Sequence, residues 1–264
     1  MQRAMTRREQ VLRELGLVRW RLRSSGGAGE SEQSAPVTAS AQDEALQAAV
    51  AAERPQASAR EDAAGAASAE VATLEWRQLE AAVRSCRACA LHARRRQSVF
   101  GVGDEQADWL FVGEGPGAEE DERGEPFVGQ AGRLLDSMLS SIGLRRGHDV
   151  YIANVVKCRP PGNRVPEPAE AAQCEPFLQR QIALIRPRLV IALGKTAALS
   201  LLRTDASIAS LRGRVHPFQG THLLVTYHPA YLLRNLPDKA KAWEDLCMAR
   251  ELMAKLKAGQ DILN

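Results

Sequence analysis

The sequence contains no run of 18 or more consecutive apolar residues, so it offers no segment that would span a membrane as a helix. Its first residues, MQRAMTRREQVLRELG, lack the apolar stretch of a secretory signal peptide. Aromatic residues are scarce at 5%, and five cysteines in 264 residues are too few for a disulfide scaffold. We therefore expect a cytoplasmic protein without membrane contact, in which clustered thiols bind metal or carry out redox chemistry.

The net charge of +3 is small, but its distribution divides the chain into three blocks. Residues 1–25 carry seven arginines and two glutamates, whereas residues 26–70 carry eight acidic residues, two arginines and no aromatic residue. A segment such as 26–70 buries too little apolar surface to offset the entropy of ordering it. We expect a basic amphipathic peptide at 1–25, a disordered Ala/Glu/Ser-rich linker at 26–70 and one globular domain at 71–264.

Short apolar runs alternate with helical patterns in the last block, which is typical of a parallel sheet with crossover helices. We expect strands at 109–112, 150–153, 189–193 and 223–227, and a closing helix at about 238–256. This pattern predicts an α/β fold, a three-layer α/β/α sandwich around a four-stranded, mainly parallel sheet. Ligands bind such sheets at the carboxyl ends of the strands, so the turn at 113–117, Asn154, the turn at 194–195 and His228 mark the candidate site.

The first of these strand ends reads GEGPGAEEDERGE, a glycine turn followed by acidic residues. Gly113, Gly115 and Ala118 formally fit the dinucleotide-binding fingerprint G-x-G-x-x-G/A. Acidic side chains at the start of the following helix would repel a pyrophosphate, because a phosphate site needs a positive helix start. The glycines instead favour close approach of a backbone or a ligand, with the carboxylate of Glu114 projecting into that space.

Five motifs follow one another along the chain: GEGPG, PFVGQAGRLLD, NVVKCRPPGNRVPEP, ALGKTA and YHPAYLLR. On these motifs the chain from about residue 73 to about residue 246 resembles the family 4 uracil-DNA glycosylases, the iron–sulfur class of bacteria and archaea. The resemblance implies a uracil-DNA glycosylase-like fold and a monofunctional, monomeric enzyme of base excision repair. Such an enzyme hydrolyses the N-glycosidic bond of deoxyuridine in single- or double-stranded DNA and leaves an abasic site.

The side chains at the predicted strand ends suit this chemistry, which requires the target base to be flipped into a pocket. Phe127 would stack on the flipped base, and Asn154 carries the acceptor and donors that match the N3–H and O4 edge of uracil. His228 would donate a hydrogen bond to O2 of the departing base. Glu114 would hold the attacking water and stabilise the cationic sugar.

Other candidate residues flank this set. Gly115 stands where the best-known uracil glycosylases place a water-activating aspartate, so Glu120 is a second candidate for holding the water or for excluding a thymine methyl group. In the segment after His228, Leu232 or Leu233 would fill the space left by the flipped base, and Arg234 would contact a phosphate.

Four of the five cysteines form two pairs in distant segments. Cys86 and Cys89 are separated by two residues. Cys158 and Cys174 are separated by 15 residues, and both lie after the first two predicted strands. Four thiolates from two segments suit a tetrahedral metal centre. The spacing alone leaves zinc and a [4Fe–4S] cluster open; the resemblance favours the iron–sulfur cluster, in a structural role.

Residues 7–23, RREQVLRELGLVRWRLR, place leucines and Trp20 among arginines. We interpret this segment either as a basic arm attracted to DNA or as a peptide that docks on a protein partner, with Trp20 as its anchor. The stretch LRELGLVRWRLR resembles the N-terminal peptide of the psi subunit of bacterial DNA polymerase III, which implies a contact with the replication clamp loader.

Two alternatives to a glycosylase are a non-catalytic iron–sulfur protein that binds nucleic acid on the same fold, and an iron–sulfur electron carrier. An electron carrier would not need Phe127, Asn154 and His228 together at the strand ends. Relatives that trap uracil covalently carry a glutamine in the glycine motif and an inserted basic loop with a histidine. This chain has Gly115 and the loop PPGNRVPEP at these places, so catalytic turnover is favoured.

Overall fold

A computed structural model of the chain describes residues 69–260. The basic peptide expected at 1–25 lies outside the described residues, and so does the expected linker except for its last two positions. Among the described helices, none combines the length and apolar character needed to cross a membrane.

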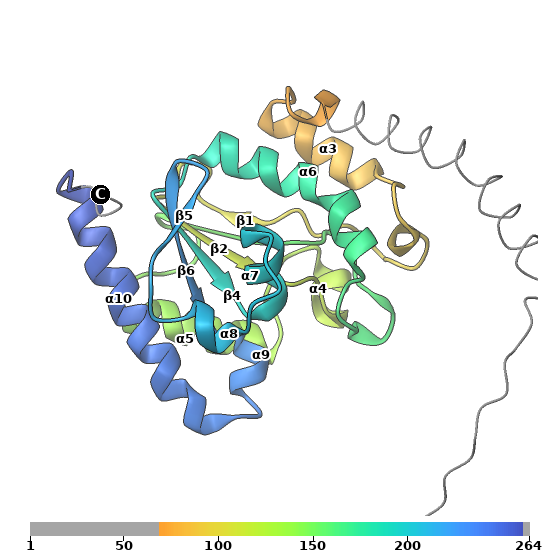
Figure 1. Ribbon diagram of the computed structural model, residues 1–264. Coiled ribbons are helices and arrows are strands. Elements are labelled where there is room, and N and C mark those ends of the chain that lie inside the picture. Colours follow the sequence, from red (N-terminus) through yellow and green to blue (C-terminus); the bar gives the residue numbers. More distant parts are fainter. Residues whose placement is uncertain (1–68, 261–264) are drawn as a thin grey trace, which may run out of the picture. The chain divides into compact units, whose positions relative to one another are not determined.

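The centre of the domain is a mixed six-stranded sheet with the strand order β1-β3-β2-β4-β6-β5 (Figure 1). Four neighbouring strands are parallel. These parallel strands are β2 (Trp109–Gly113), β3 (Val150–Asn154), β4 (Leu189–Leu193) and β6 (Thr221–Thr226). They correspond to the four strands expected from the sequence, because strands buried on both faces appear as continuous apolar runs.

The two edge strands correct the expected four-stranded sheet. β1 (Val102–Gly103) pairs antiparallel with β3, and β5 (His216–Phe218) pairs antiparallel with β6. β1 has two residues and β5 has three, and both are partly exposed, so neither forms an apolar run. Pro217 lies within β5, which is tolerated because an edge strand leaves one row of backbone groups unpaired.

Alternate residues of the central strands face two separate hydrophobic cores, which makes the domain three-layered. On β2, Leu110 and Val112 pack into the core formed with α3, α6 and α7, whereas Trp109 and Phe111 pack into the core formed with α5 and α10. Figure 1 shows these two groups of helices on opposite sides of the sheet. The helices are α3 (Trp76–Ser85), α4 (Ala118–Arg123), α5 (Gln130–Ser141), α6 (Pro168–Ile185), α7 (Lys195–Leu202), α8 (Ile208–Leu211), α9 (Pro229–Leu232) and α10 (Lys239–Lys257), with 3₁₀ turns η1 (Ala90–Ala93), η2 (Pro161–Asn163) and η3 (Leu236–Asp238).

Candidate active site

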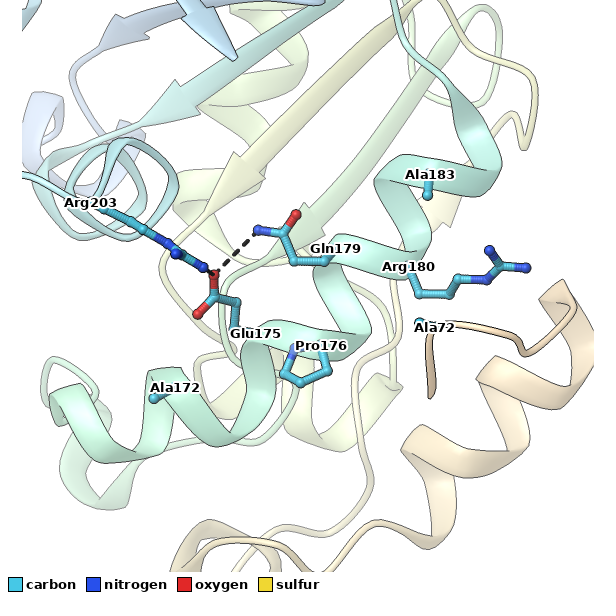
Figure 2. Close-up of a pocket in the computed structure, with 8 residues that line it drawn as sticks. All are labelled: Ala72, Ala172, Glu175, Pro176, Gln179, Arg180, Ala183 and Arg203. Carbon is cyan, nitrogen blue, oxygen red and sulfur yellow. Dashed lines mark hydrogen bonds and ion pairs between the residues drawn. The ribbon is translucent and has the colours of Figure 1, made fainter. Parts of the chain in front are cut away.

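A surface cavity of about 420 Å³ lies along α6, away from the predicted site residues (Figure 2). Its charged lining is already paired: Arg203 forms an ion pair with Glu175 at 2.8 Å, and Arg180 donates to the Leu74 carbonyl oxygen at 2.7 Å. None of the residues predicted to bind a base, a metal or DNA lines this cavity. The candidate site is therefore built at the carboxyl ends of the parallel strands, where the polar side chains meet.

Gly113 and Asn154 end two adjacent strands and lie opposite each other in the sheet register. A Cβ atom added at Gly113 would lie 2.5 Å from Asn154 Oδ1 and 2.5 Å from Phe127 Cζ. Only a glycine leaves room for both neighbours at this position. The first glycine of the GEGPG turn thus allows the amide of Asn154 and the ring of Phe127 to meet at one point.

Asn154 carries a buried acceptor without a partner. The residue is 2% exposed, and its buried Oδ1 has no hydrogen-bond partner among the described residues. Buried polar groups are normally hydrogen-bonded, so an exception at a strand end indicates a group reserved for a ligand. The Asn154 amide is therefore placed to accept a hydrogen bond from a planar donor such as a base edge.

Phe127 is held beside Asn154 in a conformation that few non-glycine residues adopt, with φ of 56°. Its ring is 7% exposed and lies 5.5 Å from the His228 ring, at an angle of 30°. A Cβ atom added at Gly132 would lie only 1.7 Å from the Phe127 carbonyl oxygen, so the glycine of the QAG motif lets α5 pass directly beneath this residue. The arrangement gives the site a rigid aromatic face.

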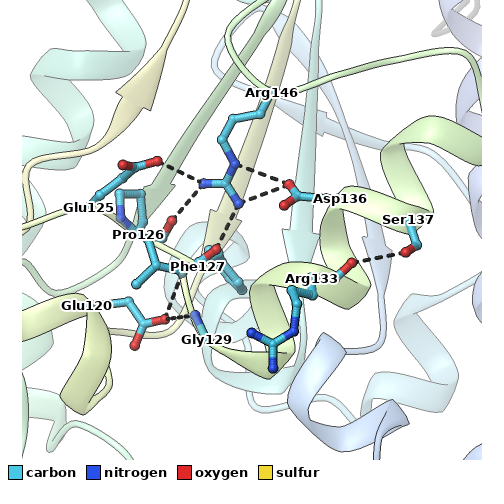
Figure 3. A network of polar contacts seen from close by, with 10 residues as sticks. Glu120, Glu125, Pro126, Phe127, Gly129, Arg133, Asp136, Ser137 and Arg146 are labelled. Carbon is cyan, nitrogen blue, oxygen red and sulfur yellow. Dashed lines mark hydrogen bonds and ion pairs between the residues drawn. The ribbon is translucent and has the colours of Figure 1, made fainter. Parts of the chain in front are cut away.

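Arg146 holds the backbone that carries Phe127 (Figure 3). Its guanidinium donates to the carbonyl oxygens of Pro126 at 2.7 Å and Phe127 at 2.8 Å. Asp136, on α5, accepts from the same guanidinium at 3.0 Å, and Glu125 lies 3.6 Å away. Fixed donors of this kind stabilise the unusual backbone at Phe127. The sequence alone gave no signal for this role, because Arg146 lies 19 residues from Phe127.

Glu120 joins the glycine turn to the start of α5 (Figure 3). Its Oε2 accepts from the backbone N–H of Gly117 at 3.0 Å, and its Oε1 accepts from those of Val128 at 2.9 Å and Gly129 at 3.1 Å. Both carboxylate oxygens are thus bonded to backbone. The structure places Glu120 as a brace between two loops of the site.

Glu114 follows β2 directly and is half-buried. Its carboxylate accepts a short hydrogen bond from the hydroxyl of Thr196, near the start of α7. A Cβ atom added at the next residue, Gly115, would lie 2.7 Å from Val156 Cγ2, so the turn packs tightly against the segment after β3. Thr196 lies within the ALGKTA motif, but only the fold shows that it orients the Glu114 carboxylate.

His228 follows β6 and enters the site as a neutral donor. Burial, and to a lesser extent the charge of Arg234, lower the pKa of its imidazole to about 4, while Glu120 acts in the opposite direction. Nδ1 accepts from the backbone N–H of Ala230 at 3.1 Å, so the single proton of the neutral ring is on Nε2. Gly194 has φ of 90°, and a Cβ atom added there would lie 2.7 Å from His228 Cβ. The glycine of ALGKTA therefore makes room for this histidine.

The two leucines predicted to contact DNA, in the segment after His228, differ in their exposure. Leu232 is 1% exposed and packs in the core formed with α5 and α10, whereas Leu233 is 39% exposed. Arg234, the next residue, is also exposed. Leu233 and Arg234 are thus the pair that this segment presents at the surface.

The four predicted metal ligands line one small cavity. Cys86 caps the end of α3 and Cys89 precedes η1, while Cys158 follows β3 and Cys174 lies on α6. Within residues 69–260, no three metal-binding side chains are grouped closely enough to hold a single metal ion as placed. The two cysteine pairs, 69 or more residues apart in the sequence, nonetheless converge as a four-thiol set, which is the donor set of zinc and iron–sulfur centres.

Two cations surround these thiols. Arg95 donates to Cys158 Sγ at 2.9 Å, and the backbone N–H of Lys157 donates to Cys174 Sγ at 3.3 Å. Burial raises the pKa of Cys174 to about 12 and also raises that of Cys158, while the neighbouring cations oppose both shifts. Donors and positive charge of this kind stabilise thiolates once a metal displaces their protons. The residues present therefore fit a thiolate-bound metal centre.

The sequence was also compared with known protein families and proteins. Residues 100–247 match the family model of the uracil DNA glycosylase superfamily. A Type-4 uracil-DNA glycosylase of Thermotoga maritima is 45% identical over 178 residues, which are 66% of this chain and 92% of that protein. A Type-4 uracil-DNA glycosylase of Archaeoglobus fulgidus is 46% identical over 57% of this chain and 79% of its own length, and one of Pyrobaculum aerophilum is 41% identical over 66% and 93%.

Proposed function

Because the chain belongs to the uracil DNA glycosylase superfamily, we infer that it is a uracil-DNA glycosylase, an enzyme that hydrolyses the N-glycosidic bond of deoxyuridine in DNA. The observation that carries its specificity is the buried, unpartnered Oδ1 of Asn154 beside the rings of Phe127 and His228. The substrate is uracil-containing DNA, and the product is an abasic site.

Recognition of uracil follows from the Asn154 amide. A base flipped out of the duplex stacks on Phe127, with its Watson–Crick edge towards the amide. Oδ1 accepts from uracil N3–H, and Nδ2 donates to O4. Cytosine presents an acceptor at N3 and donors at N4, so it would leave the buried Oδ1 facing a lone pair. The site therefore rejects cytosine, the normal base that differs from uracil at N3 and at the substituent on C4.

Bond cleavage leaves a uracil anion, whose O2 needs a hydrogen-bond donor. His228 supplies this donor as a neutral imidazole, because its Nδ1 is occupied by the Ala230 N–H and its proton is on Nε2. The low pKa keeps the ring neutral across the physiological range, so His228 stabilises the leaving group by a hydrogen bond rather than by a positive charge.

The sugar becomes cationic as the bond breaks, and an anion beside it lowers the barrier. We assign this role and the positioning of the attacking water to Glu114, whose carboxylate is oriented by the Thr196 hydroxyl. Glu120, the second candidate, supports the site by holding three backbone N–H groups. These hydrogen bonds keep the glycine turn and the Phe127 loop at a fixed separation.

The four thiols are proposed to hold a [4Fe–4S] cluster. Cys86 and Cys89 would tie the N-terminal part of the domain to Cys158 and Cys174, which flank the segment after Asn154. When bound, the cluster supplies a rigid cross-link between these segments. DNA contact is assigned to Leu233 as the wedge and to Arg234 on a phosphate, since both are exposed beside His228.

The direct test is incubation of the purified chain with single- and double-stranded oligonucleotides that contain one uracil, followed by alkaline cleavage. Strand breaks at the uracil position, and none at cytosine, are the expected result. Binding of the same oligonucleotides without any cleavage would instead support the non-catalytic nucleic-acid-binding alternative.

Asn154→Ala should slow uracil release by about 10- to 100-fold, because one buried hydrogen-bonding partner contributes about 1–3 kcal/mol when its loss leaves the other group unpaired. The measurement is single-turnover cleavage at saturating enzyme. Asn235→Ala is a matched control, since Asn235 follows α9 and its side chain donates to the Tyr231 carbonyl oxygen. Equal rates for the Asn154 variant and the wild type would remove Asn154 from base recognition.

The N-terminal segment remains a separate proposal, because residues 7–23 lie outside the described residues. We expect a peptide of residues 1–25 to capture the replication clamp-loader complex, and Trp20→Ala to abolish the capture, since a buried aromatic anchor dominates such interfaces. The linker at 26–70 would then keep the enzyme at a high effective concentration near its partner. Binding of both peptides to DNA alone, with equal affinity and steep salt dependence, would favour a basic arm.

A further inference from the structure

Leu233 and Arg234, to which DNA contact is assigned, come directly after a helix of a single turn. This helix, α9, has four residues, and the backbone N–H groups of Tyr231 and Leu232 donate to the His228 carbonyl oxygen at 2.9 and 3.2 Å. A helix of this length is not stable by itself, so contacts with the rest of the domain determine where it lies. The position of Leu233 and Arg234 therefore depends on what the side chains of α9 contact.

Tyr231 closes the loop that carries Leu233 and Arg234. Its hydroxyl donates to Asp238 Oδ2 at 2.6 Å, seven residues further along the chain. Asp238 ends η3 and directly precedes α10, and its Oδ1 lies 2.8 Å from Lys241 Nζ. Hydrogen bonds to a carboxylate are shorter and stronger than those between neutral groups. The bond between the two side chains thus turns the segment between them into a closed loop, which contains the exposed Leu233 and Arg234.

The ring of Tyr231 packs on Tyr227, the residue before His228. The two ring centroids are 5.1 Å apart and the rings are inclined by 16°. On Tyr227, the guanidinium carbon of Arg212 lies 4.8 Å from the ring centroid, and Arg212 binds the Asp245 carboxylate through two hydrogen bonds at 2.8 and 2.9 Å. The side chains of this ion pair are 12% and 4% exposed, and a two-bond pair of arginine and carboxylate has a defined geometry. The Tyr231 ring is therefore supported by side chains that are themselves fixed.

We propose that Tyr231 is a positioning residue for DNA, which holds Leu233 and Arg234 in the orientation that enters the duplex when uracil is flipped out. This inference rests on the proposed function. An apolar residue that inserts into a duplex fills the space left by the flipped base and offsets the cost of unstacking it. A loop that is already fixed in that orientation loses less conformational freedom on insertion than a mobile loop. A single strand has no paired base to separate, so the contribution of Tyr231 is largest with double-stranded DNA.

Tyr231→Phe tests this role, because it keeps the stacked ring and removes only the hydroxyl. In full-length protein, the variant should lose about tenfold in kcat/KM on double-stranded DNA with one uracil, since two side chains must then be ordered on insertion. Its affinity for double-stranded DNA with an abasic site should fall by a similar factor. The kcat/KM on a single-stranded oligonucleotide and the inhibition constant of free uracil should each change less than about twofold, because neither ligand requires insertion into a duplex.

Tyr151→Phe is the matched control. It removes the same hydroxyl group from a tyrosine that is buried on β3, where the hydroxyl accepts from Gln181 at 3.5 Å. The ratio of kcat/KM on double-stranded DNA to that on single-stranded DNA should equal the wild-type ratio in this variant. A lower stability alone affects both substrates equally, so the ratio separates positioning of the loop from a general structural effect.

Variants of Asp238 identify the hydrogen bond that acts. Asp238→Ala removes the acceptor and should reproduce the loss seen in Tyr231→Phe, whereas Asp238→Asn keeps an acceptor oxygen and should retain most of the activity on double-stranded DNA. The double variant Tyr231→Phe/Asp238→Ala should lose no more than either single variant, since both changes break the same bond. Asp238→Ala also serves as the main test if Tyr231→Phe fails to fold.

A folded Tyr231→Phe protein with the wild-type kcat/KM on double-stranded DNA would overturn the proposal. Equal losses with double-stranded DNA, single-stranded DNA and free uracil would overturn it too, because this pattern indicates general destabilisation. Additive losses in the double variant would show that Tyr231 and Asp238 act independently. If the wild-type protein releases no uracil, the proposed function fails, whereas the affinity for double-stranded DNA with an abasic site still decides the role of Tyr231.

Discussion

Replacing His228 with alanine should slow uracil release by about 10²-fold or more, the loss typical when one donor to a developing anion is removed. The neutral ring presents its Nε2 proton because Nδ1 is occupied by the backbone N–H of Ala230. Without that proton, O2 of the departing uracil would carry its charge without a protein donor. The measurement is the single-turnover cleavage rate on an oligonucleotide with one uracil, at saturating enzyme.

The effect should be confined to the chemical step. His148→Ala is the matched control, because His148 is exposed and lies before β3, at the opposite end of the sheet from the site. That variant should cleave at the wild-type rate. The His228 variant should still bind DNA with an abasic site, and a near-normal cleavage rate in it would show that another group stabilises the leaving base.

Replacing Cys158 with alanine should remove the metal centre and destabilise the domain at the same time, because the free energy of metal binding contributes to the free energy of folding. Cys158 is 6% exposed and belongs to the larger hydrophobic core, so its loss affects both the centre and the packing. A loss of about 3 kcal/mol corresponds to about 10 °C in the thermal midpoint of a domain of this size. Iron content, visible absorption and thermal denaturation are the three measurements.

Cys247→Ala is the control for this prediction. Cys247 is half-buried on α10 and does not line the cavity of the four thiols, so its replacement should leave metal content and thermal midpoint unchanged. A colourless wild-type protein with stoichiometric zinc would refute the iron–sulfur assignment. It would leave the glycosylase function intact, since none of the proposed base-binding groups belongs to the metal centre.

The parallel core of the sheet was predictable from the sequence because its strands are buried on both faces. β4 was predicted at its observed bounds, Leu189–Leu193, and all five of its residues are buried. β5 was missed because an edge strand of three residues with a proline carries no apolar signal. The rule that ligands bind at the carboxyl ends of parallel strands then pointed to Asn154 and His228, each of which ends or follows a strand.

Sequence motifs by themselves determined the family, the strand ends and the set of four cysteines, because each of these depends on residue type at short spacing. Only the tertiary structure decided which side chains contact one another. Thr196 meets Glu114 across 82 positions of the chain, and Gln181 meets Lys157 across 24. Neither pairing has a local pattern, since such contacts arise only after strands and helices pack against each other. The fold therefore determined how the carboxylate of Glu114, for which we propose a catalytic role, is held in place.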